Sequence, residues 1–275
     1  MKKVYSVISI FIISVYFVYS IHNNTTTIRN DVTIHIKDSN VAPQSLKIAV
    51  IGDIHLPERS HHLEKFRDIL IEIKDARPDL VIFLGDYIQN HKKLENFSAH
   101  RKNIIKAIKL IDPLPIAVVL GNHETYSNVN TWISEFARFG IHAMENEVKS
   151  ISVKNRKVCV RGLGDHNTNR FVYRDFPPDC KNRPKITITH DPAGAFNGPV
   201  QGLVFSGHTH CGQIRFPLLG AVYVPTDAPS EAHCGLYHTK RLTLFVTSGV
   251  GNSIVPVRYG AQSQWDFVSL NINKK

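Results

Sequence analysis

The chain has 275 residues, of which 43% are hydrophobic, so it can bury a full-sized globular core and is not intrinsically disordered. Its 33 lysines and arginines exceed its 23 aspartates and glutamates, and the net charge of +10 favours phosphates, nucleic acids or anionic lipid head groups as partners. The basic residues are scattered and form no aromatic-basic repeat, so nucleic acid is not the expected partner.

The first residues differ in composition from all that follow. Two lysines precede an uncharged, strongly apolar run from residue 4 to residue 21, a pattern typical of an export signal or a membrane anchor. Cleavage after Ser20 is an alternative, but no Ala-x-Ala is present, so we favour an uncleaved signal-anchor over residues 1–21. The charged start would hold the amino end in the cytoplasm and leave the catalytic domain outside. Residues 22–45 are polar and are interpreted as a linker.

Short β-rich runs then alternate with segments of helical periodicity, the pattern of a layered α/β protein. We predict strands at residues 46–51, 80–84, 116–120, 157–163, 186–189, 203–206 and 242–247, and helices at 61–75, 95–111 and 130–139. The first half alternates strand and helix, whereas the second half passes mostly from strand to strand. This arrangement predicts one domain over residues 46–275, with two sheets packed face to face and helices outside.

Polar residues able to bind metal follow five of the predicted strands. They lie in Gly52-Asp53-Ile54-His55, Gly85-Asp86, Gly121-Asn122-His123-Glu124, His190-Asp191 and Gly207-His208-Thr209-His210. The carboxyl ends of strands in an α/β sheet meet along one rim, where ligands usually bind. Residues two apart in an extended segment share a face, so both members of the Asp53/His55 pair can reach one ion, and so can both members of the His208/His210 pair.

The donor types indicate which metals would bind. Imidazole nitrogens mixed with carboxylate and amide oxygens suit manganese, iron, zinc or cobalt better than calcium. A bridging carboxylate, here Asp86, would hold two divalent ions about 3.5–4 Å apart, the separation used in phosphoryl-transfer chemistry. The sequence therefore predicts a two-metal cluster at the strand ends, made by Asp53, His55, Asp86, Asn122, His190, His208 and His210.

These five ordered blocks resemble the calcineurin-like metallophosphoesterase superfamily, over roughly residues 47–272. The resemblance implies a four-layer αββα double β-sandwich and the hydrolysis of phosphoester bonds. By this resemblance, Asp53, His55 and His210 would bind the first metal, and Asn122, His190 and His208 would bind the second. Asp86 would bridge the two metals. His123 would bind no metal but would protonate or stabilise the leaving oxygen.

A narrower resemblance comes from the later part of the chain. Gly-His-Thr-His-Cys-Gly-Gln-Ile-Arg from Gly207, the run from Phe245 to Gly251 and the tetrapeptide from Pro256 to Tyr259 resemble a bacterial branch of membrane-associated phosphoesterases. That branch includes a UDP-2,3-diacylglucosamine pyrophosphatase of lipid A synthesis, although Cys211 stands where the branch usually has glycine. The resemblance implies a bacterial cell-envelope phosphodiesterase or pyrophosphatase acting on a phosphorylated, lipid-linked or nucleotide-sugar substrate.

Several alternatives remain open at the level of sequence. The chain could be a catalytically inert, metal-stabilised envelope protein that binds polyanions. It could also be a nuclease. The connection over residues 211–240 could line an acyl-chain groove or form a β-hairpin that caps the core. The basic connection over residues 165–183 could bind an anion or be solvated surface. Four cysteines permit two disulfides, one or none, and the sequence does not pair them.

Overall fold

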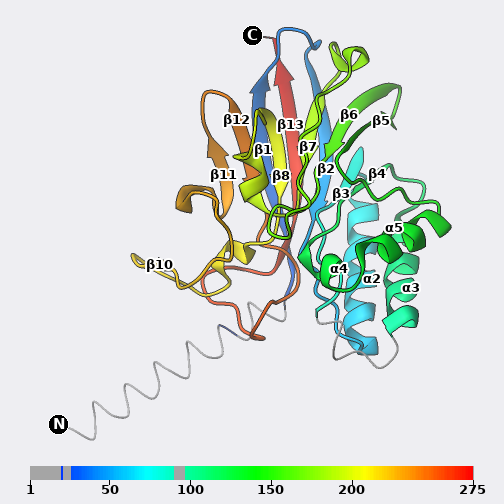
Figure 1. Ribbon diagram of the computed structural model, residues 1–275, viewed down its shortest axis with the longest axis vertical. Coiled ribbons are helices and arrows are strands. Elements are labelled where there is room, and N and C mark those ends of the chain that lie inside the picture. The colour runs from blue at the N-terminus through cyan, green and yellow to red at the C-terminus, as the bar shows by residue number, and fades with distance from the viewer. Residues whose placement is uncertain (1–19, 21–25, 90–96, 275) are drawn as a thin grey trace, which may run out of the picture.

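The computed structural model describes residue 20 and residues 26–89 and 97–274 (Figure 1). The predicted signal-anchor over residues 1–21 therefore lies outside the described residues except for Ser20. Within the described part of the chain, no helix combines the length and the apolar character needed to cross a bilayer.

The first sheet has five strands and carries the helices on its outer face. Its strands, in spatial order, are β1 (Ile28–Lys37), β13 (Gln264–Asn273), β2 (Gln44–Ile51), β3 (Leu80–Phe83) and β4 (Ile116–Val118). Figure 1 shows α2 (Ser60–Asp75), α3 (Phe97–Ile108) and α5 (Val129–Arg138) together on one side of the molecule. In α2, Phe66, Leu70 and Ile73 recur at helical spacing and are buried, which fixes the face that packs on the sheet.

The second sheet has six strands, and its inner face packs against the first sheet. Its order is β11 (Gly235–His238), β12 (Leu242–Val246), β8 (Gly202–Ser206), β7 (Lys185–Ile188), β6 (Arg156–Gly162) and β5 (Glu147–Val153). One apolar cluster joins residues of both sheets, among them Val50, Ile82, Val160 and Phe205, all fully buried. The predicted α/β fold of two facing sheets is therefore confirmed.

The outer face of the second sheet is covered differently from that of the first. Two 3-10 helices, Pro192–Ala195 and Ser230–Ala232, bring Ala195 and Ala232 into a cluster with Val204 and Leu244 of the sheet. Among the described residues, all the α-helices precede β5 in the chain. This fourth layer is thus built from irregular segments with short 3-10 turns.

The interpretation of residues 22–45 as a linker is wrong for Ile28–Lys37, and β2 already begins at Gln44. All ten residues of β1 pair in parallel with β13, and Ile34 is fully buried. Val32, Ile34 and Ile36 alternate with polar residues, which is the pattern of a half-buried strand, but the polar majority around them obscures it. The folded domain therefore begins near residue 28 rather than at residue 46.

The four cysteines, all among the described residues, form two disulfides. Cys159 in β6 pairs with Cys180, and Cys211 pairs with Cys234 across the connection that follows the last histidine pair. Each bond closes a loop of about twenty residues, a length for which a disulfide typically stabilises a fold by about 3 kcal/mol. The second disulfide ties the long connection to the strand-end segment that carries His210.

Candidate metal centre

The predicted site residues lie where the strands of both sheets end, on tightly turned backbone. Five of them have φ values in the left-handed region that non-glycine residues rarely adopt: Asp53 at 50°, His55 at 45°, Asp86 at 53°, His208 at 69° and His210 at 49°. Such conformations cost about 1–3 kcal/mol each and persist where the surrounding structure enforces them, often at functional sites. The turns aim these side chains inward, and all five are buried.

The first group of side chains joins the ends of β2 and β8. Asp53, His55 and His210 bring one ligand atom each within 4.8 Å of one another. His55 Nε2 lies 3.0 Å from His210 Nε2, which in turn lies 3.7 Å from Asp53 Oδ1. Three donors from two sheets thus converge on one point.

The second group joins the ends of β3, β4, β7 and β8. His190 Nε2 lies 3.1 Å from Asn122 Oδ1, 3.2 Å from His208 Nδ1 and 3.3 Å from Asp86 Oδ2. The same Asp86 oxygen lies 3.5 Å from His55 Nε2 of the first group. Asp86 therefore stands between the two groups, and all seven predicted ligands are brought together.

Hydrogen bonds to backbone carbonyls orient two of the imidazoles. His190 Nδ1 donates to the carbonyl of Leu84 at 2.7 Å, and His208 Nε2 donates to the carbonyl of Pro225 at 2.6 Å. Because a carbonyl only accepts, the other nitrogen of each neutral ring keeps its lone pair and faces the cluster. His190 would thus bind through Nε2 and His208 through Nδ1.

The electrostatics of the cluster favour a bound cation. Burial raises the pKa of Asp53 to about 7, an effect that His190 partly offsets, and burial lowers the pKa of His55 to about 3. Burial also acts to raise the pKa of Asp86, but the charges of His190 and His123 outweigh it and hold that pKa well below its usual value. Burial acts to lower the pKa of His190, but the charge of Asp86 outweighs it and raises that pKa well above its usual value. A divalent cation bound beside Asp86 would replace the ring proton as its positive partner and leave the neutral imidazole that binds metals, so the residues fit such ions.

His123 differs from the seven in its exposure. Its side chain is 21% exposed, against 3% for Asp86, and its Nε2 lies 3.8 Å from Asp86 Oδ2. Its ring stands edge-on to that of His55 at 4.6 Å. His123 therefore lies at the mouth of the cluster, where one face of the ring can meet a ligand from solvent.

Two buried residues support the cluster without having been assigned a role from sequence. Glu124, fully buried, accepts hydrogen bonds from the backbone N–H groups of Asp86, Tyr87 and Gly121. Arg258, also fully buried, donates to the carbonyls of Ser248 and Gly249, and its Nη2 lies 3.2 Å from His210 Nδ1. Both occur inside motifs that the sequence singled out, but only the fold shows what they contact.

The basic connection over residues 165–183 is occupied with internal contacts. Arg170 makes a two-pronged ion pair with Glu145 at 2.7 Å and also donates to the carbonyls of Leu120 and Gly121. Arg183 donates to Asp179 at 2.7 Å. Arg170 thus stabilises the segment that carries Asn122, and these contacts favour a structural role over anion binding for this connection.

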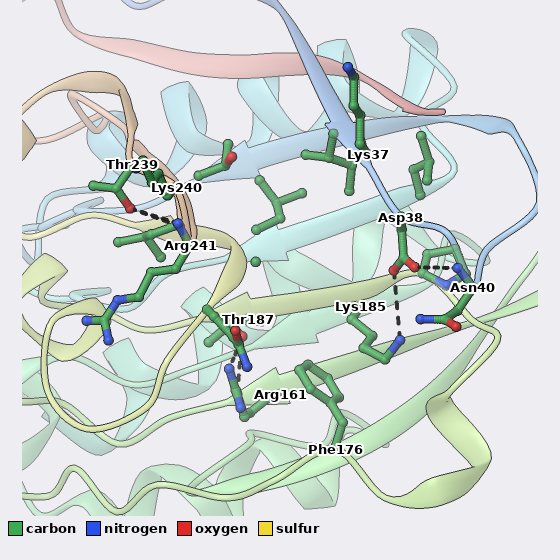
Figure 2. Close-up of a pocket in the computed structure, with 18 of the residues that line it drawn as sticks. Lys37, Asp38, Asn40, Arg161, Phe176, Lys185, Thr187, Thr239, Lys240 and Arg241 are labelled. Carbon is green, nitrogen blue, oxygen red and sulfur yellow. Dashed lines mark hydrogen bonds and ion pairs between the residues drawn. The ribbon is translucent and has the colours of Figure 1, made fainter. Parts of the chain in front are cut away.

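Two smaller pockets adjoin the cluster, and a larger cavity lies elsewhere. A pocket of about 350 Å³ is lined by His55, Arg59 and Lys65, and one of about 160 Å³ is lined by His210. A cavity of about 760 Å³ opens at the other ends of the strands (Figure 2), and none of the seven predicted ligands lines it. In this cavity the buried Arg161 donates to Thr187 Oγ1 at 2.8 Å, and its guanidinium lies over the ring of Phe176. Of the predicted metal ligands, His55 and His210 line the two smaller pockets.

Comparison with known families identifies the kind of centre. The sequence model of the family described as calcineurin-like phosphoesterase matches residues 46–212, which include all seven predicted ligands. The chain belongs to the calcineurin-like phosphoesterase family. It is accordingly a metal-dependent phosphoesterase, and the clustered carboxylates and imidazoles indicate divalent metal ions.

Relatives of this phosphoesterase come from bacteria and vertebrates. The uncharacterized metallophosphoesterase YkuE of Bacillus subtilis is 27% identical, with 85% of this chain and 83% of that protein covered. The phosphodiesterase YaeI of Escherichia coli is 28% identical over 78% of this chain and 77% of its own. A transmembrane protein with metallophosphoesterase domain from Bos taurus is 27% identical over 80% of this chain, which spans 52% of the bovine protein. A crystal structure of a dimetal phosphatase from Danio rerio has a TM-score of 0.39 and 13% identity, with 68% of this chain and 90% of that one covered.

Proposed function

We propose that this phosphoesterase hydrolyses a phosphodiester or pyrophosphate bond at a centre of two divalent cations. The observation that carries the proposal is the position of Asp86 Oδ2, 3.5 Å from His55 Nε2 and 3.3 Å from His190 Nε2. One cation would be held by Asp53, His55 and His210, the other by Asn122, His190 and His208, and both by Asp86. The donor set suits manganese, iron, zinc or cobalt.

The residues of the site would have different roles in the reaction. Bound divalent cations would polarise the phosphoryl group and supply a nucleophile at neutral pH. The carbonyls of Leu84 and Pro225 orient His190 and His208, while Glu124 holds the backbone of Asp86. His123, whose side chain is partly exposed beside Asp86, would donate its ring proton to the leaving oxygen, as a general acid does.

We further propose a lipid-linked or nucleotide-sugar substrate of the UDP-2,3-diacylglucosamine kind, met at the membrane of a bacterial cell envelope. Support comes from the apolar run over residues 4–21 and from the relatives named as a phosphodiesterase and as a transmembrane protein. Apolar residues Val222, Tyr223 and Ile254 line the pocket at His210, where an acyl chain could lie. Residues 1–21 would act as an uncleaved signal-anchor that leaves the domain outside the cytoplasm.

The test of the reaction is nitrophenol release from bis(p-nitrophenyl) phosphate by the manganese-loaded full chain. Asp86→Ala and His208→Ala should lose bound metal and at least a hundredfold in rate, since outer-shell losses alone cost about 10–100-fold. His123→Ala should lose rate but keep its metal content. The exposed Asp75→Ala at the end of α2 is the matched control and should keep both.

The outcomes separate this proposal from its alternative. Full rate and metal content in Asp86→Ala would overturn the assignment, and no nitrophenol release from metal-loaded wild type would favour an inert polyanion-binding protein. Rates on UDP-2,3-diacylglucosamine, simple diesters and monoesters then rank the substrate classes. A preference for simple diesters would refute the lipid-linked substrate and leave the reaction class standing.

A further inference from the structure

We propose that an apolar rim beside the metal centre inserts into the surface of a lipid bilayer. The rim consists of seven exposed apolar residues from two segments: Phe216, Leu218, Leu219, Val222, Tyr223, Ile254 and Val255. The inference rests on the signal-anchor proposed above, and it goes beyond the proposed reaction because it concerns the surface on which the protein sits rather than the bond that it hydrolyses.

The degree of exposure sets the rim apart from the rest of the surface. Leu218 is fully exposed, Leu219 and Ile254 are each 85% exposed, and Val222 is 67% exposed. Single exposed apolar residues are normal on soluble proteins, but a contiguous group of large ones marks an interaction surface. Tyr223, which is 62% exposed, has an apolar ring and a polar hydroxyl, as aromatic residues at membrane interfaces do.

Contacts between the two segments make the rim one surface. The first segment is a hairpin of β9 (Arg215–Phe216) and β10 (Gly220–Ala221), and the second is the loop around Ile254. The rings of Phe216 and Tyr259 lie 5.2 Å apart, and Arg215 N donates to the carbonyl of Tyr259 at 2.7 Å. Figure 1 shows the hairpin projecting sideways from the body, at the left of the view and on the side opposite α2 and α3. The hairpin itself therefore does not cap the core, whereas Ser230–Ala232, later in the same connection, does cover the second sheet.

The rim is also tied to the metal centre. Gln213, three residues after His210, donates through Nε2 to the carbonyl of Val255 at 2.7 Å and accepts from Ser253 N at 2.9 Å. The disulfide of Cys211 anchors the same segment. A bilayer into which the rim inserts would thus hold the metal centre at a fixed distance from the bilayer surface.

The start of the described chain indicates which surface covers the rim. Ser20, one residue before the end of the apolar run, donates to the carbonyl of Arg258 at 2.9 Å. The carbonyl of Thr26 accepts from Gln262 Nε2 at 2.6 Å, so Ser20 and Thr26 each contact the segment over residues 258–262 that follows Ile254. A membrane that held the apolar run would lie against this side of the molecule, which commits the rim to a bilayer rather than to a second protein.

The charge around the rim fits anionic head groups. Arg215 is exposed within the hairpin. Arg59 and Lys65 line the pocket that opens at His55 on the other side of the same loop. Basic side chains beside an inserted apolar surface are attracted to anionic lipids. The rim and its basic flank therefore form an interfacial surface with the metal centre between them.

Tryptophan quenching in vesicles tests the insertion directly. The full chain is reconstituted into vesicles of phosphatidylethanolamine and phosphatidylglycerol with brominated acyl chains, which quench only tryptophans that contact them. Leu219→Trp and Ile254→Trp probe the rim, and Ile71→Trp, 50% exposed on α2, is the control on the same tethered molecule. Native Trp132 and Trp265 are fully buried and supply a constant background.

The expected result is a blue-shifted emission for both rim variants and quenching at least threefold greater than for Ile71→Trp. Quenching equal to that of the control at both positions would overturn the proposal. Leu219 does not line the pocket at His210, so nitrophenol release by Leu219→Trp in detergent should match that of wild type, and circular dichroism verifies the fold of Ile254→Trp. Because quenching does not depend on turnover, its failure and the failure of the proposed function are separate results.

Discussion

Glu124 provides a quantitative test of how the metal-binding segments are held in place. Its carboxylate accepts from the backbone N–H groups of Asp86 at 2.8 Å and of Tyr87 and Gly121 at 2.9 Å. Glu124→Ala leaves three buried donors without an acceptor, and each such group costs about 1–3 kcal/mol. We expect the free energy of unfolding to fall by about 3–9 kcal/mol.

Glu124→Gln distinguishes the hydrogen bonds from the charge. Its amide oxygen can replace Oε2, which serves Asp86 and Gly121, so only the bond from Tyr87 is lost, at a cost of about 1–3 kcal/mol. Burial, reinforced by the charge of Asp86, raises the pKa of Glu124, so removing the charge offsets part of that cost.

Urea unfolding followed by circular dichroism measures both variants of Glu124. The exposed Glu64→Ala of α2 is the control and should stay within about 0.5 kcal/mol of wild type. An alanine variant that loses no more stability than the glutamine variant would refute the reasoning.

Three other perturbations have defined outcomes. Burial raises the pKa of Asp266 from 3.8 to about 6, so its contribution to stability is present below pH 3.8 and is lost as the pH rises through 6. Asp266→Asn should therefore gain up to about 3 kcal/mol over wild type between pH 4 and pH 7 in chemical denaturation, and a pH-independent difference would contradict this. A Cβ at Gly207 would stand 2.5 Å from Asp53 Oδ2, so Gly207→Ala should weaken manganese binding at least tenfold in calorimetry, whereas unchanged affinity would exclude that contact. Chelation of bound metal should lower the melting temperature by several degrees, since a ligand at a hundred times its Kd adds about 2.7 kcal/mol, and an unchanged melting temperature would argue against a folded-state metal site.

Local sequence patterns predicted the elements that carry the site. The strands before Asp53, Asp86 and His208 are short, apolar and followed by glycine, and each is found within two or three residues of its predicted bounds. Helix α2 was also predictable from the sequence, because its apolar residues repeat at helical spacing. Patterns of this kind depend only on residues that are close in the sequence, so they can be recognised without knowledge of the fold.

What the sequence missed depends on contacts between distant residues. Strand β1 is defined by its pairing with β13, more than two hundred residues away, and its own composition is mostly polar. The pairing of four cysteines and the contact of Arg258 with His210 likewise follow from the packing of two sheets. The roles of Glu124 and the exposed hairpin were hidden for the same reason, although both lie in segments that the sequence had marked.

The most direct test of the two-metal centre is an anomalous difference map at the manganese absorption edge, from crystals of the protein grown with manganese. The account predicts two peaks about 3.5–4 Å apart, with the carboxylate of Asp86 between them. The peak beside Asp53, His55 and His210 should be separate from the one beside Asn122, His190 and His208. A single peak, or peaks away from Asp86, would contradict the central claim.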